Sequence, residues 1–132
     1  MIEHSLSDDD RRFQADFDHR AHVRLAYTYL AENDAETALA GMRSALLAFL
    51  RHNGIDPSRY HETMTRAWIL AVRHFMEISG DSASASAFIE NSPTLLDAKI
   101  MLTHYSAALL FSPEARARFV EPDLGPIPRH EP

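Results

Sequence analysis

The chain has 132 residues, of which 45% are hydrophobic and 24% are charged, and its formal net charge is −6. This length and composition are typical of one globular domain that can bury a core of its own. The negative charge argues against nucleic acid as a partner, because proteins that bind it carry a basic surface. The sequence contains no cysteine, which excludes disulfides, thiolate zinc sites and cysteine nucleophiles.

The first ten residues are polar and acidic, unlike a signal peptide, and no apolar run is long enough to span a bilayer. We therefore expect a cytoplasmic protein that has no membrane partner. The acidic run from Asp8 to Asp10 is typical of a solvated helix start.

Capping residues, apolar spacing and helix-stop residues predict a series of helices along the chain. In chain order, the expected helices span residues 8–16, 18–30, 34–53, 57–79, 82–90, 93–110 and 113–119. Gly54 and Gly80 are natural ends for the third and fourth of these. Pro57, Pro93 and Pro113 stand at helix starts, where proline is tolerated.

No segment shows the alternation of apolar and polar residues that is typical of a strand. We therefore expect an all-α fold, a single domain over 1–132 that forms a bundle of about five main helices. The proline-rich tail, 119–132, cannot be regular helix. We expect it to lie extended against the bundle, with Phe119, Val120 and Leu124 as anchors, and we expect Trp68 inside the core.

Four of the eight histidines fall on or beside the apolar stripes of three expected helices. His19 and His22 share one stripe, His61 adjoins a second, and His104 lies on a third. A polar group on a buried stripe costs free energy unless it has a partner. We therefore expect His22, His61 and His104 to converge on one pocket, with His19 or Glu62 at its edge.

The first functional hypothesis is a small helical protein whose His-rich internal pocket binds a transition metal and supports catalysis. His19, His22 and His61 fall in or near first turns, where the helix dipole favours neutral imidazole, the form that binds metal. Neutral imidazoles with a carboxylate suit Zn, Fe, Ni or Cu. In this hypothesis His19, His22, His61 and His104 are the metal ligands and Glu62 is the general base.

The second hypothesis is a non-enzymatic binding or accessory module whose histidines form a structural polar core. Known metal motifs fit the sequence badly. His61 and Glu62 begin like HExxH, but Thr65 stands where the second histidine belongs, and no Glu-x-x-His occurs. Either hypothesis allows a small-molecule ligand, and the second allows an exposed apolar face that forms a homo-oligomer.

Four segments of the chain resemble a family of short, uncharacterised bacterial proteins. They are FDHRAHVRLAY at 17–27, YHETMTRAW at 60–68, HYS at 104–106 and LFSPEARARFVEPDL at 110–124. Together they cover about two fifths of the chain and occur in the family's order. The resemblance implies that the four histidines and Glu62 belong to the family's motifs, and that the FVEPD segment of the tail is docked. It implies no activity, because none is assigned to the family.

Overall fold

The computed structural model describes residues 8–80 and 82–129, and every regular element in that part of the chain is a helix. The expectation of an all-α protein is therefore confirmed. With η denoting 3-10 helices, the elements are α1 (Asp8–Glu32), α2 (Ala35–His52), η1 (Pro57–Arg59), α3 (Glu62–Ser79), α4 (Ala85–Asn91), η2 (Pro93–Leu96), η3 (Ala98–Thr103), α5 (Ala107–Leu110) and α6 (Pro113–Ala117). Residues 130–132 of the expected tail lie outside the described residues. No helix in the described part is both long and apolar enough to cross a membrane.

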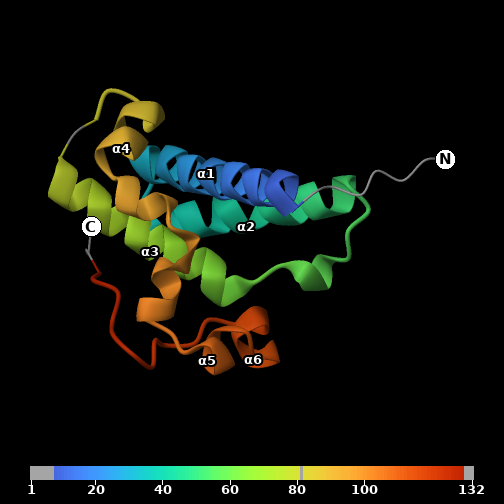
Figure 1. Cartoon of the computed structure of the whole chain (residues 1–132). Coiled ribbons are helices and arrows are strands. Elements are labelled where there is room, and N and C mark those ends of the chain that lie inside the picture. Colours follow the sequence, from blue (N-terminus) through green and yellow to red (C-terminus); the bar gives the residue numbers. More distant parts are fainter. Residues whose placement is uncertain (1–7, 81, 130–132) are drawn as a thin grey trace.

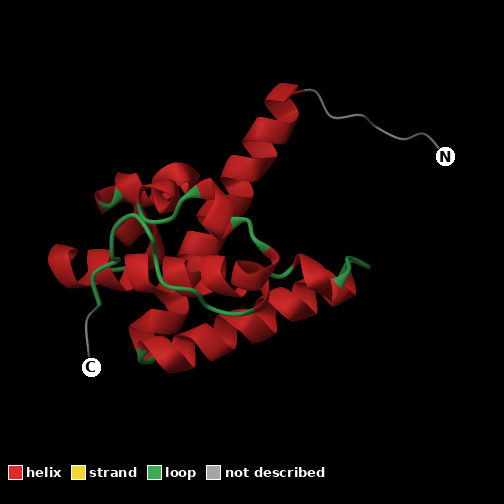
Figure 2. Ribbon diagram, turned by 90° about the horizontal axis from the view of Figure 1, so that it is seen from below, coloured by secondary structure: helices red, strands yellow, loops and turns green. Residues whose placement is uncertain are grey.

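The three longest helices, α1, α2 and α3, contact one another pairwise and form the main body (Figure 1). Small residues stand at their contacts, since Ala26, Ala38 and Ala67 are fully buried. Gly41 of α2 has the same role, because a Cβ atom there would lie 2.5 Å from the Tyr29 ring of α1. Small side chains thus let the helices pack closely. The N-terminal part of α1 extends past the other helices (Figure 2).

The helix boundaries confirm some of the expected starts and stops. Asp34 caps α2, since its side chain accepts a hydrogen bond from the Thr37 amide at 2.8 Å. Gly54 and Gly80 both adopt positive φ angles, 68° and 74°, just beyond the ends of α2 and α3. These are positions where glycine is favoured because it has no Cβ.

Three expected boundaries are wrong, and each has a local cause. The expected break between residues 16 and 18 is absent, because neither proline nor glycine interrupts α1. The expected helix over 57–79 is split, because Asp56 caps only the short η1 and α3 begins afresh after His61. The expected helix over 93–110 is divided into η2, η3 and α5, because Asp97 and Ser106 each cap a new start.

The C-terminal segment, which we define as residues 92–129, consists of these short helices and the extended tail, and it is held to the main body by side chains. The buried Thr63 hydroxyl of α3 donates to the Arg118 carbonyl at 2.9 Å and accepts from the Val120 amide at 3.1 Å. Within the segment itself, the Tyr105 hydroxyl donates to the Val120 carbonyl at 2.7 Å. The residues from 119 to 129 therefore lie docked on the helices.

The apolar anchors of the tail agree only in part with those expected, since Val120 packs against the core cluster and Phe119 is partly buried. Leu124 is 60% exposed, whereas Ile127 is 6% exposed and belongs to the core cluster. Leu124 lies in a turn in which the His104 carbonyl accepts hydrogen bonds from the amides of Leu124 and Gly125, and its side chain is exposed to solvent.

The tail contact gives a stability prediction. Thr63→Val keeps the shape of the side chain but leaves the Arg118 carbonyl and the Val120 amide without their partner. A buried backbone group without a partner costs about 1–3 kcal/mol, so we expect the free energy of unfolding to fall by at least about 2 kcal/mol in urea titrations. Thr28→Val, at an exposed hydroxyl on α1, is the matched control and should change it by less than about 0.5 kcal/mol. Equal effects of the two variants would contradict the docking role of Thr63.

Candidate functional site

His61 caps α3 and at the same time binds the C-terminal segment. Its Nδ1 accepts a hydrogen bond from the Met64 amide at 3.0 Å, and its Nε2 donates to the Leu110 carbonyl at 2.7 Å. The ring is therefore neutral, with one nitrogen as acceptor and the other as donor. Burial, aided by the charge of Arg116, holds the pKa of His61 below its usual value of 6.5. In this arrangement His61 has no lone pair left for a metal or a proton.

His19 and His104 also bind main-chain carbonyls of the C-terminal segment. His19 donates from Nε2 to Leu95 at 2.9 Å, and His104 donates from Nδ1 to Gly125 at 2.8 Å. The His19 ring also contacts the indole of Trp68 edge-on, at a centroid distance of 4.5 Å. These two histidines and His61 therefore bind carbonyls at three separate points of the C-terminal segment, residues 95, 110 and 125.

Glu62 belongs to a three-residue ionic cluster. Its carboxylate accepts two hydrogen bonds from Arg43 of α2, at 2.9 and 2.6 Å, and one from the Tyr60 hydroxyl at 2.7 Å. The Arg43 guanidinium, and secondarily Tyr60, lower the pKa of Glu62. Burial, together with the Glu62 charge, raises the pKa of Tyr60 to about 12. The cluster joins α2 to the start of α3, and it holds the carboxylate that the sequence suggests as a general base.

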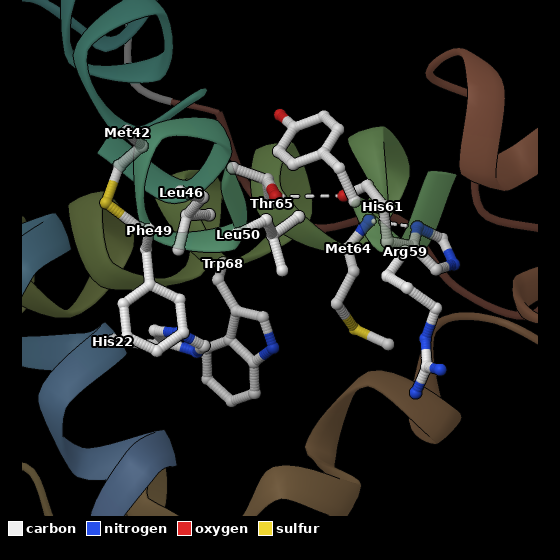
Figure 3. A pocket seen from close by; sticks show the side chains of 11 residues that line it. His22, Met42, Leu46, Phe49, Leu50, Arg59, His61, Met64, Thr65 and Trp68 are labelled. Atoms are coloured by element: carbon white, nitrogen blue, oxygen red, sulfur yellow. Dashed lines mark hydrogen bonds between the residues drawn. The ribbon is translucent and has the colours of Figure 1, made fainter. Parts of the chain in front are cut away.

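A cavity of about 240 Å³ opens between α1, α2 and the first half of α3 (Figure 3). Its apolar lining consists of Met42, Leu46, Phe49, Leu50, Met64 and Trp68. Trp68 is half-buried here, so the expectation that it lies inside the core holds only in part. Phe49, at the rim, is 60% exposed. The cavity is therefore an open, mostly apolar site rather than the expected His-rich pocket.

The polar residues that line the cavity are His22, Arg59, Tyr60, His61 and Thr65. Two of the three histidines expected to converge, His22 and His61, thus line one cavity, but His19 and His104 are not part of its lining. The Thr65 hydroxyl donates to the carbonyl of His61, the N-cap residue of α3, at 2.8 Å (Figure 3). The apolar cavity was missed from the sequence because Leu46, Phe49 and Leu50 fit an ordinary core stripe.

The part of the chain that the structure describes contains no group of three or more His, Asp or Glu side chains placed to hold a metal ion. The hydrogen bonds of His61 and Glu62 account for this in part, since they direct both groups toward protein partners. No protein-family model, curated protein or solved structure was found to match the chain.

The contacts of His61 predict how stability depends on pH. Because the folded state lowers the pKa of His61, the unfolded chain takes up the proton first, and stability is lost as pH falls below about 6.5. His61→Asn can still cap α3 but does not titrate. We expect the variant to be less stable at pH 7.5 and to lose less stability than the wild type between pH 7 and pH 5. Urea titrations at each pH measure this, and parallel pH profiles would contradict it.

The Glu62 cluster gives a second stability prediction. Glu62→Gln removes the charge that Arg43 binds. We expect the free energy of unfolding to fall by about 1–2 kcal/mol, because a charge-assisted hydrogen bond contributes less where it is partly exposed to solvent. Glu36→Gln, at a carboxylate that is 71% exposed and pairs with Arg66, should cost less than about 0.5 kcal/mol. If the Glu62 variant is as stable as the wild type, the cluster does not join the two helices.

Proposed function

We propose that the chain is a non-enzymatic binding module that takes up a small, largely apolar molecule in the cavity between α1, α2 and α3. The observation that carries this proposal is the lining itself, in which six apolar side chains, two of them aromatic, surround an open space. Small-molecule sites in proteins are concave and mostly apolar, with a few polar groups that fix orientation. This cavity has that composition.

The hydrogen bonds of the neighbouring polar groups favour binding over catalysis. A general base needs a free lone pair within reach of the substrate and a pKa near the working pH. The ring nitrogens of His61 are both engaged, and Glu62 is held by Arg43 with a lowered pKa. Metal-dependent catalysis by the four histidines is thus the less supported proposal, and a structural role for His19, His61 and His104 the better one.

The size of the cavity limits the ligand. A volume of about 240 Å³ corresponds to that of about eight water molecules at roughly 30 Å³ each. An apolar cavity of about 150 Å³ is enough for benzene in another protein. We therefore propose a ligand with one ring or a short alkyl chain. Binding would also cover part of the exposed Phe49 ring. Removing apolar surface from water contributes roughly 25 cal/mol per Å² to the free energy of binding. The cytoplasm is our proposed compartment, on the basis of the sequence alone.

The single tryptophan of the chain, Trp68, lies in the lining and can report binding. We expect 3-phenylpropan-1-ol to change its emission in a saturable way and to raise the melting temperature. For a ligand of about ten non-hydrogen atoms, the dissociation constant should be about 0.1–1 mM.

A larger side chain in the lining should block this binding. Leu46→Phe reduces the free volume of the cavity, so that the ligand and the larger side chain would overlap. We expect it to weaken the binding of 3-phenylpropan-1-ol at least about tenfold. Leu102→Phe, at a leucine of η3 that is 41% exposed and outside the lining, is the matched control and should bind like the wild type. No saturable change with the wild type, or equal binding by Leu46→Phe, would overturn the proposal.

A further inference from the structure

The charged residues of the cavity point to a particular class of ligand. Among the described residues that line it, none is acidic, and Arg59 carries a positive charge. The chain as a whole has a net charge of −6. Because no carboxylate is found among the described lining residues of this acidic protein, the cavity is locally favourable for an anion.

Among the described residues, Arg59 differs from the arginines that form ion pairs. Five arginines, Arg43, Arg66, Arg73, Arg118 and Arg129, form ion pairs with glutamates. For the Arg59 guanidinium no ion pair or hydrogen bond is found within the described residues, and its recorded bond is made by its main-chain carbonyl, which accepts from Arg116. Its charge is therefore available to a ligand.

The carboxylates closest to Arg59 in the sequence are already engaged. Asp56 caps η1 by accepting from the Ser58 amide at 2.9 Å. Glu62 is bound by Arg43 and Tyr60. Neither carboxylate forms an ion pair with Arg59, and the charge of Glu62 is balanced by Arg43.

The position of Arg59 sets the direction of the ligand. Figure 3 shows its guanidinium group beside the end of the Met64 side chain, while Phe49, Trp68 and His22 gather on the other side of the lining. Resting on the proposed binding function, we infer that the cavity takes a small amphiphilic carboxylate, whose aryl or alkyl part contacts Phe49 and Trp68 and whose carboxylate binds Arg59. An Arg–carboxylate pair can be bidentate, which fixes the orientation of the ligand.

Two ligands with the same carbon skeleton test this inference, the anion 3-phenylpropanoate and the neutral 3-phenylpropan-1-ol. Titration against Trp68 emission at pH 7.5 should show that the wild type prefers the anion by about fivefold, as a charge-assisted contact at a partly solvated site allows. Arg59→Met keeps the length and apolar character of the side chain but removes its charge. It should lose the preference while binding the alcohol within about twofold of the wild type, because uncharged contacts are retained.

Three further measurements complete the test. Arg20→Met removes an exposed arginine of α1 that is not part of the lining, and it should keep the preference. Arg59→Lys should keep part of the preference for the anion. In the wild type, about 1 M NaCl should reduce this preference, since salt screens exposed charges. If the wild type binds both ligands equally, or Arg59→Met still prefers the anion, the inference is overturned while the binding function stands. If neither ligand binds to the wild type, both fail.

Discussion

The fold depends on imidazole groups that bind main-chain carbonyls. The C-terminal segment has few regular hydrogen bonds of its own, because it is divided into 3-10 turns, helices of four or five residues and an extended tail. Such a segment stays buried only if its carbonyl and amide groups find partners elsewhere. His19 and His61, which precede the segment in the chain, supply two of them, and Thr63 supplies two more. His104 binds the Gly125 carbonyl from within the segment. Charged imidazole would lose the acceptor nitrogen with which His61 caps α3.

The sequence predicts the helical class of the fold well because its signals are local. The cap at Asp34 and the stops at Gly54 and Gly80 depend on one turn of backbone each, and all three occur as expected. The interior of 93–110 was predicted less well, because Asp97 and Ser106 can either continue a helix or cap a new one. Which of the two occurs depends on tertiary packing, and spacing along the chain does not contain that information.

The candidate site shows the same division between local and distant information. The argument that stripe histidines need partners is correct for His19, His61 and His104, and their positions were visible in the sequence. Their partners were not, because each is a main-chain carbonyl, and every residue has one. The sequence therefore suggested that the histidines bind together, whereas in the structure they bind the C-terminal segment one by one. The cavity could not be predicted either, since it forms where Phe49 and Trp68 stop short of complete burial.

The bonds to the C-terminal segment also affect the order in which the protein folds. They join residues separated by 76, 49 and 55 positions, from His19 to Leu95, from His61 to Leu110 and from Thr63 to Arg118. Contacts of such separation form late, because the entropy of closing a long loop is lost before they contribute. During synthesis the three long helices leave the ribosome first. The side-chain donors of His19, His61 and Thr63 stay exposed to water until the last third of the chain has been synthesised. Pulse-labelled hydrogen exchange should therefore show protection of the amides in α2 and α3 before those around residues 95, 110 and 118.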